Sequence, residues 1–406
     1  MNRYLIVADD FTGANDTGVQ LTRRGISTRV TLSFQGIHKD SHSYVLDTES
    51  RGLDAREAYL KVKQQAECLD FSCFQYLIKK VDSTLRGNIA MEVKALDEVY
   101  QSELIIFMPA LPDLKRTTSC GIHYLHGVPV TQTELNEDPL KPVTKDCLKE
   151  ILEEAYDEPV RQIGLEEIRE NKISLDGGRI FTFDAETNQD MRTVVKSAEA
   201  LGKRTLWVGS AALADHLLEQ EVKELPSMAL VASVSETTRN QVKYAEKSGT
   251  SLVCVPVYEI MENEDDSAYV EQAVRLLSAG KDTILLSSAS YDRVELIHTI
   301  DYGSQKGMKR EAVSEAVQAI MGTLAKKILE KVEISGLFLT GGDTAMGFFE
   351  KAGCEGSAIT GEMSTGIPMM RLTGGTFDGL KVITKAGAFG NEDAIFYGLR
   401  KLKEQI

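Results

Sequence analysis

Short apolar runs alternate with amphipathic, helix-like stretches along most of the chain. The first run, Tyr4–Ala8, precedes a helix-like stretch over residues 14–24, a glycine stop at Gly25 and a second run over residues 28–32. This order predicts a βαβ unit, because a strand, a helix and a second strand follow one another closely. The pattern predicts helices over residues 54–69 and 89–100, and further strands at residues 43–46, 76–80, 104–108, 179–183 and 205–208.

The second half of the chain repeats the alternation after a charged break over residues 217–228, where a new strand begins at residues 228–232. Helices are then predicted over residues 238–247, 267–278 and 309–332, and strands over residues 251–255, 283–287 and 336–340. We therefore expect an α/β protein of two domains, each with a mainly parallel sheet flanked by helices, and an active site in the cleft between them. The predicted domains are residues 1–220 and 228–406, with residues 221–227 as a linker or hinge.

Composition supports this division and excludes several classes of protein. The 406 residues are 42% hydrophobic, enough for a large core and long enough to split into two. A formal net charge of −15 argues against nucleic-acid binding, which needs basic faces. No apolar run reaches the roughly 18 residues of a membrane span, and the first run is too short for a signal peptide. Six cysteines without a paired spacing indicate reduced thiols, so we expect a cytoplasmic protein without membrane partners.

The first strand is followed by the segment ADDFTGAND, which carries adjacent carboxylates at Asp9 and Asp10. Carboxylates at a strand end can accept hydrogen bonds from substrate hydroxyls, bind a metal, or take a proton from an attacking hydroxyl. The structural alternative is that Thr12 or Asp16 merely caps the next helix. That alternative explains the Asp9–Asp10 pair poorly, because like charges at a strand end repel unless something binds them.

Two more segments of the first half place cations and hydroxyls after predicted strands. The segment KKVDSTLRGN contains Lys80, Asp82, Ser83, Thr84 and Arg86, and LDTESRGL contains Arg51. Arginine binds carboxylates bidentately, and hydroxyls with the N–H groups of a helix start complete an anion site. A surface arginine in a turn would explain Arg51 equally well.

Residues 109–142 are rich in Pro, Gly and polar residues, which predicts a long functional loop. His123 and His126 within it are spaced for a metal, but the sequence offers no third ligand beside them. We therefore assign no metal site to the residues of this chain.

In the second half, glycines and hydroxyls gather after two predicted strands and in two later segments. Ser233 and Ser235 precede a helix, and the turn formed by Gly341, Gly342, Asp343 and Thr344 follows another strand. Such turns let backbone N–H groups approach phosphate oxygens, although helix capping would explain the serines alone. The segments over residues 361–366 and 387–393 are predicted as further glycine-rich turns. Neither GxxxxGK[ST] nor GxGxxG occurs, which disfavours a P-loop or a standard dinucleotide fold.

Taken in order, the segments ADDFTGAND, TESR, KKVDSTLRGN, PALP, SVSETTRNQ, LTGGDTA and KAGAFGNED resemble the four-carbon acid sugar kinase family. The resemblance spans nearly the whole chain. It implies an N-terminal domain that binds the acid sugar, a C-terminal domain that binds ATP, and phosphoryl transfer to the terminal hydroxyl of a C4 acid. The segment GEMSTG departs from the pattern expected of the family, so we assign its residues no contacts.

The resemblance also implies roles for individual residues and for two cofactors, ATP and Mg²⁺. Asp10 is our first candidate for the catalytic base and Asp82 the second. The substrate-binding residues would be Asp9, Asp10, Arg51, Lys80, Val81, Asp82, Ser83 and Arg86. The nucleotide would be bound by Ser233, Ser235, Gly341, Gly342, Asp343, Thr344 and Gly387.

The exact reaction stays open at the level of sequence. D-threonate is our first candidate substrate, with D-erythronate and 3-oxo-tetronate as alternatives, and domain closure about residues 217–227 would protect ATP from water. Outside this class, an NAD-linked hydroxy-acid dehydrogenase would also need two α/β domains, but the dinucleotide glycine pattern is missing. A non-catalytic acid-sugar sensor would leave the C-terminal glycine turns unexplained. The sequence does not decide between a monomer and a homo-oligomer.

Overall fold

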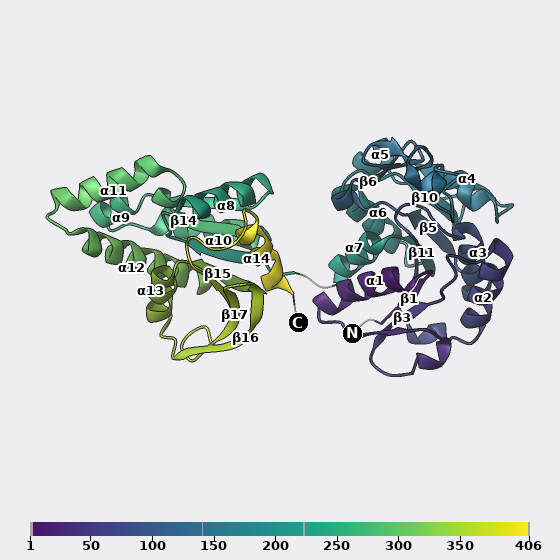
Figure 1. Ribbon diagram of the computed structural model, residues 1–406, viewed down its shortest axis with the longest axis horizontal. Coiled ribbons are helices and arrows are strands. Elements are labelled where there is room, and N and C mark those ends of the chain that lie inside the picture. Colours follow the sequence, from purple (N-terminus) through teal and green to yellow (C-terminus); the bar gives the residue numbers. More distant parts are fainter. Residues whose placement is uncertain (1–2, 140, 222–223, 405–406) are drawn as a thin grey trace. The chain divides into compact units, whose positions relative to one another are not determined.

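Each half of the chain folds around its own largely parallel β-sheet with helices on both faces (Figure 1). The computed structural model describes residues 3–139, 141–221 and 224–404. Packing divides the chain into two units, and the second begins at Glu224. Of the predicted linker, residues 222–223 lie outside the described residues. On either side of them, Glu221 ends a helix and Ser227 begins a strand.

The sheet of the first unit is parallel throughout, in the order β2-β3-β1-β4-β11-β5-β10-β9. Its central strand β1 therefore lies between β3 and β4, which come from different parts of the sequence. The strands are β1 (Tyr4–Ala8), β2 (Thr28–Thr31), β3 (Ser43–Asp47), β4 (Tyr76–Lys80), β5 (Leu104–Met108), β9 (Val160–Ile163), β10 (Ile180–Phe183) and β11 (Thr205–Gly209). These agree with the predicted strands to within one residue at each end, and β9 is additional.

Helices cover both faces of this sheet because its strands are apolar on both sides. Tyr4 and Ile6 of β1 pack into one hydrophobic core with α1, α6 and α7, and the intervening Leu5 and Val7 pack into another with α2, α3 and α4. Alternation with a period of two is the expected geometry of a strand. The helices are α1 (Phe11–Arg23), α2 (Ala55–Glu67), α3 (Ile89–Tyr100), α4 (Leu148–Glu153), α5 (Leu165–Arg169), α6 (Asn188–Glu199) and α7 (Ala211–Glu221).

The predicted long loop over residues 109–142 is wrong, because much of it forms a small antiparallel sheet. Its strands are β6 (Arg116–Ser119), β7 (Ile122–Leu125) and β8 (Val128–Pro129). Two tight turns join them, Cys120-Gly121 and His126-Gly127, and all four turn residues have positive φ, between 51° and 81°. Positive φ at both central residues is the signature of a type I′ hairpin turn, which a glycine in second place favours.

The sheet of the second unit has the order β13-β14-β12-β15-β18-β17-β16 and is parallel from β13 to β18. The strands are β12 (Ser227–Val231), β13 (Ser251–Val255), β14 (Thr283–Ser287), β15 (Gly336–Thr340), β16 (Gly356–Ser364), β17 (Ile367–Thr373) and β18 (Lys381–Lys385). Its helices are α8 (Glu236–Lys247), α9 (Val257–Asn263), α10 (Ser267–Ser278), α11 (Arg293–Gln305), α12 (Arg310–Leu329), α13 (Gly342–Ala352) and α14 (Ala394–Lys403).

Strands β16 and β17 form an antiparallel hairpin at one edge of the second sheet (Figure 1). The predicted glycine-rich turn over residues 361–366 is therefore mostly strand, and only its end makes the hairpin turn, where Gly366 has a φ of 78°. No helix in the described part of the chain is both long and apolar enough to cross a lipid bilayer.

Candidate active site

Three neighbouring parallel strands bring the polar segments of the first half together. Strands β3, β1 and β4 lie side by side, and their carboxyl ends meet at one edge of the sheet. Asp9 and Asp10 follow β1, Arg51 lies in the loop after β3, and the Lys80–Arg86 segment ends β4. Sequence reasoning proposed these residues as one site, and the strand order explains why they are close in space.

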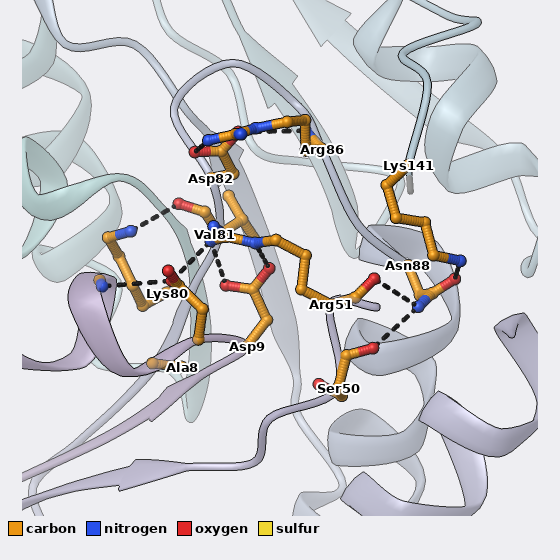
Figure 2. Close-up of polar contacts among 12 residues, drawn as sticks. Ala8, Asp9, Ser50, Arg51, Lys80, Val81, Asp82, Arg86, Asn88 and Lys141 are labelled. Atoms are coloured by element: carbon orange, nitrogen blue, oxygen red, sulfur yellow. Dashed lines mark hydrogen bonds and ion pairs between the residues drawn. The ribbon is translucent and has the colours of Figure 1, made fainter. Parts of the chain in front are cut away.

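Arg51 holds the two adjacent carboxylates, and its two-point contact with Asp9 is drawn in Figure 2. Its Nε donates to Oδ2 of Asp9 at 2.7 Å, and its Nη2 donates to Oδ1 of Asp9 at 2.9 Å and to Oδ1 of Asp10 at 2.6 Å. Asp9 is almost fully buried, whereas Asp10 is partly exposed. The like charges of Asp9 and Asp10 are thus offset by one guanidinium, in the bidentate geometry that arginine favours.

Asp10 also caps α1, so the structural alternative, capping by Thr12 or Asp16, does not hold. Oδ1 of Asp10 accepts the backbone N–H of Gly13 at 3.2 Å, so the helix starts at Phe11 rather than at residue 14. A Cβ atom at Gly13 would lie 2.6 Å from that oxygen and 2.9 Å from Nζ of Lys80. A side chain at this position would therefore displace the Asp10 carboxylate and the Lys80 ammonium from their present places.

Lys80 is a buried cation next to these carboxylates. Its Nζ donates to the backbone oxygen of Val81 at 2.9 Å, and no ion pair to it is recorded within the described residues. Burial lowers the pKa of Lys80, and the charges of Asp9 and Asp82 oppose that shift. Val81 itself is buried, and its N–H donates to Gly209 at 2.9 Å. An anion that reached this edge would find an ammonium without a direct carboxylate partner.

Asp82 is engaged by its own segment. Nε of Arg86 donates to its Oδ2 at 2.8 Å and Nη2 to its Oδ1 at 3.4 Å, and the hydroxyl of Thr84 also donates to Oδ2 (Figure 2). Burial alone would raise the pKa of Asp82, but the hydrogen bonds from Arg86 and Thr84 hold it well below the usual range. A carboxylate so stabilised in its charged form is a weak proton acceptor.

The small sheet over residues 116–129 contributes two residues that sequence reasoning did not assign to this site. Arg116 donates to the hydroxyl of Ser83, and Nε2 of His123 lies 2.9 Å from the backbone oxygen of Ser83. Nδ1 of His123 lies 2.9 Å from the hydroxyl of Thr118, and burial lowers the pKa of His123 to about 4. His123 is thus a neutral buried link between this sheet and the end of β4.

The same contacts leave neither nitrogen of the His123 ring available as a metal ligand, because both nitrogens already have protein partners. No group of three or more His, Cys, Asp or Glu side chains in the described residues is placed to hold a metal ion. Nothing in the Pro- and Gly-rich sequence around Arg116 indicated that it would reach Ser83. Only the recognition of the two type I′ turns, and so of β6 and β7, could have suggested it.

The loop after β3 is held in place from two sides. Asp47 ends β3, and its Oδ1 accepts the N–H of Glu49 at 2.9 Å, which supports the positive φ of 45° at Glu49. The other oxygen of Asp47 is buried without a hydrogen bond, and burial raises the pKa of Asp47 to about 6. On the far side, Nδ2 of Asn88 donates to the carbonyl of Ser50 at 3.0 Å (Figure 2). It also donates to the carbonyl of Leu53 at 3.0 Å.

A second polar cluster forms at the carboxyl ends of β12, β15 and β18, which are also neighbours in their sheet. Ser235 caps α8, and its hydroxyl donates to the carbonyl of Gly387 at 2.7 Å. A Cβ atom at Gly387 would lie 2.5 Å from the hydroxyl oxygen of Ser233. The N–H of Gly341 donates to the carbonyl of Lys385 at 2.7 Å, which joins the glycine turn after β15 to the end of β18.

The start of α13 leaves donors available at this edge. Gly341, with a φ of 97°, precedes the helix and provides no side-chain cap, and no other capping acceptor for the first N–H groups of α13 is recorded in the described residues. Asp343 is exposed in the first turn, Thr344 is buried, and Gly342 borders open space. The structure therefore brings Ser233, Ser235, Gly387 and the turn starting at Gly341 together. The buried Lys385 joins them and was not predicted as a site residue.

Comparison with family models agrees with this division of the chain. Residues 4–217 match a sugar-binding N-terminal domain, and residues 228–395 match a nucleotide-binding C-terminal domain. The two matches cover most of the sequence, and each falls on one of the polar clusters described above.

Individual relatives span the full length. A D-threonate kinase of Salmonella typhimurium is 33% identical over 97% of this chain and 98% of its own. A D-erythronate kinase of Heliobacterium modesticaldum is 27% identical over 97% of this chain and 95% of its own. A crystal structure from Bordetella bronchiseptica, a domain-swapped dimer with bound citrate, is 26% identical with a TM-score of 0.66, covering 99% of this chain and 98% of that one. The chain therefore belongs to the four-carbon acid sugar kinase family and is a phosphotransferase.

Proposed function

We propose that this kinase transfers the terminal phosphoryl group of ATP to the 4-hydroxyl of D-threonate. The relative with 33% identity carries the name D-threonate kinase, which favours this acid over D-erythronate and 3-oxo-tetronate. The observation that carries the proposal is the cluster at the ends of β3, β1 and β4. It combines a partly exposed carboxylate, Asp10, with two cations, Lys80 and Arg116, for which the described residues show no carboxylate partner.

The cations of this cluster divide into two groups, and the division suggests how the acid would be oriented. Arg51 and Arg86 are already paired with aspartates. Lys80 and Arg116 have no recorded ion pair in the described part of the chain, and Nε of Arg116 is buried without a hydrogen-bond partner. We therefore assign the substrate carboxylate to Lys80 and Arg116. Arg51 and Arg86 would instead hold the aspartates that face the substrate hydroxyls.

Asp10 is the better candidate for the catalytic base. One of its oxygens accepts from Arg51 and Gly13, and no contact to Oδ2 is recorded in the described residues. Both oxygens of Asp82 accept hydrogen bonds. In the proposed step the 4-hydroxyl oxygen bonds to the γ-phosphorus, the bond to the bridging oxygen breaks, and ADP leaves. Asp10 takes the hydroxyl proton.

The nucleotide would be bound at the ends of β12, β15 and β18. The donors present there fit a polyphosphate: the uncapped start of α13, the hydroxyls of Ser233 and Ser235, and a close approach of backbone at Gly387 that a Cβ atom would block. The described residues offer no metal cage, so we expect Mg²⁺ to enter with ATP, bound mainly by phosphates and water. When bound, it would offset charge on the phosphates.

The two clusters must act on one phosphoryl group, so we propose that they meet when both substrates are bound. The Bordetella relative is a domain-swapped dimer, and we extend the proposal to a homo-oligomer of this chain. Light scattering would give the mass of at least two chains. X-ray scattering would show compaction only when ATP and the acid are both present, and an unchanged radius of gyration would contradict the closure.

The direct test is release of ADP with MgATP across D- and L-threonate, D- and L-erythronate and their 3-oxo forms. We expect turnover with D-threonate to exceed that with every other acid by at least tenfold in kcat/KM. A preference for D-erythronate or a 3-oxo acid would contradict D-threonate as the substrate and would leave the kinase assignment unchanged. Absence of turnover with all of them would contradict the proposed acceptor class.

A further inference from the structure

Lys385 occupies the centre of the second polar cluster. It is the last residue of β18, only 2% of its surface is exposed, and its carbonyl accepts the N–H of Gly341. Its Nζ donates to the carbonyls of Ala386 and Gly387, both at 3.1 Å. Within the described residues it has no ion pair, unlike the buried Lys79, whose Nζ lies 2.7 Å from a carboxylate oxygen of Glu92.

More hydrogen-bond donors lie around the carbonyl oxygen of Gly387 than it has lone pairs. The hydroxyls of Ser235 and Thr238 lie 2.7 Å and 2.9 Å from it, and Nζ of Lys385 lies 3.1 Å from it. A carbonyl oxygen has two lone pairs, so three strong hydrogen bonds cannot be satisfied together. The start of α13 adds further N–H donors at the same edge. Nζ of Lys385 therefore shares the Gly387 carbonyl with two hydroxyls that lie closer to it, and the cluster carries a buried positive charge with no acidic partner recorded in the described residues.

We propose that Lys385 binds the polyphosphate of the nucleotide. The proposal rests on the assignment of this cluster to ATP under the proposed function, and it adds the residue that supplies the positive charge. On binding, Nζ of Lys385 would exchange the carbonyl of Gly387 for phosphate oxygens, and the hydroxyl of Thr238 would keep that carbonyl. Phosphate oxygens would supply the charged acceptors that no described residue is recorded to give this ammonium.

Burial lowers the pKa of Lys385 to about 8. The charged residues in the first turns of α8 and α13 and in the loop before α14 are Glu236, Arg239, Asp343, Glu392 and Asp393, and none of them is recorded as a partner of Lys385 within the described ranges. A polyphosphate favours the ammonium form, so the pKa of Lys385 would rise on binding. At pH 8 nucleotide binding would therefore take up as much as about half a proton.

Calorimetry of nucleotide binding to the full chain tests the proposed role of Lys385. The variants are Lys385→Met and Lys385→Arg. The matched control is Lys381→Met, because Lys381 lies at the other end of β18, donates to carbonyls, and has a pKa also lowered by burial. We expect Lys385→Met to weaken ATP and ADP binding about 10- to 100-fold and to leave adenosine binding unchanged. Lys381→Met should bind all three ligands as the wild type does.

Proton uptake gives a second readout that does not require Lys385→Met to fold. Binding enthalpies at pH 8 in buffers of different ionisation enthalpy should show uptake for the wild type and none for Lys385→Arg, because arginine stays protonated. Unchanged ATP affinity in Lys385→Met, an equal loss of adenosine affinity, or uptake that persists in Lys385→Arg would each overturn the proposal. Failure of the wild-type chain to bind ATP would instead contradict the proposed function itself.

Discussion

Arg51 and Asp9 form a two-point ion pair, with Nε and Nη2 of the guanidinium 2.7 Å and 2.9 Å from the two carboxylate oxygens. Nη2 also reaches Asp10 at 2.6 Å. Because Asp9 is buried, the pair fixes the plane of the guanidinium, and the guanidinium in turn fixes Asp10. The orientation of the proposed base therefore depends on the fork geometry of arginine as well as on its charge.

The first prediction follows from the two-point geometry of the Arg51 guanidinium. Arg51→Lys keeps the charge but cannot bridge two carboxylates, so we expect kcat/KM for the acid to fall about 10- to 100-fold. Steady-state kinetics at saturating MgATP measures it. The matched control is Arg56→Lys, a change at an exposed arginine in the first turn of α2, which should leave kcat/KM unchanged. Wild-type kinetics in Arg51→Lys would show that charge alone suffices.

The second prediction separates the two candidate bases. Asp10→Asn retains an oxygen that can cap α1, so the fold should persist, but it removes the proton acceptor. We expect kcat to fall about 10²- to 10⁴-fold with little change in the KM of the acid. Asp82→Asn should mainly raise KM, because Asp82 is bound by Arg86 and Thr84. If Asp10→Asn turned over at the wild-type rate with a raised KM, Asp10 would be a binding group.

The third prediction concerns Arg116. If its guanidinium binds the substrate carboxylate, Arg116→Met should raise the KM of the acid about 10- to 100-fold and leave the Kd of ATP unchanged. Lys115→Met is the control, since Lys115 is the exposed neighbouring cation and the change removes one positive charge as well. An equal rise of KM in both variants would point to a general electrostatic effect instead of a contact.

The fourth prediction uses two buried groups whose pKa shifts oppose each other. His123 has its pKa lowered from 6.5 to about 4, so the unfolded chain binds more protons than the folded chain between these two pH values. The free energy of unfolding should therefore fall, by up to about 3 kcal/mol, as pH drops from 6.5 to 4. Asp47 has its pKa raised from 3.8 to about 6, so the folded chain binds more protons between these pH values. Its contribution to the free energy of unfolding therefore rises by a similar amount as pH drops from 6 to 4.

Variants separate the two contributions. His123→Gln should remove the loss of stability on acidification, and Asp47→Asn should be more stable than the wild type at pH 7 but not at pH 4. The chain has one tryptophan, Trp207, buried in β11 of the first unit, so its fluorescence during urea unfolding reports on the unit that holds both groups. A difference between Asp47→Asn and the wild type that did not change with pH would contradict the assignment.

Sequence patterns predicted the parts of this fold that depend on local order. Strands such as Tyr76–Lys80, Leu104–Met108 and Ser251–Val255 were placed to the residue, because continuous apolar runs bounded by polar turns are typical of buried parallel strands. The resemblance to acid sugar kinases named the family that the comparisons show. The dehydrogenase and sensor alternatives find no support among them.

The missed features depend on contacts between distant segments. Arg116 reaches Ser83 only because two hairpin turns carry β6 past the end of β4, and the Pro- and Gly-rich sequence there was taken for a loop. Lys385 was overlooked because a lysine at a strand end usually reaches solvent, and nothing local shows that it is buried without an acid. The start of α1 was misplaced because Asp10 serves as its cap.

The small antiparallel sheet of residues 116–129 is joined to the parallel sheet at few points, yet it brings Arg116 and His123 to the end of β4. The aspartates, in contrast, are attached to the buried central strands. Mutations in the small sheet can therefore move Arg116 while Asp9 and Asp10 keep their positions. With the substrate carboxylate assigned to Arg116 as we propose, a few substitutions in this hairpin would change the preferred acid and leave the proposed base in place.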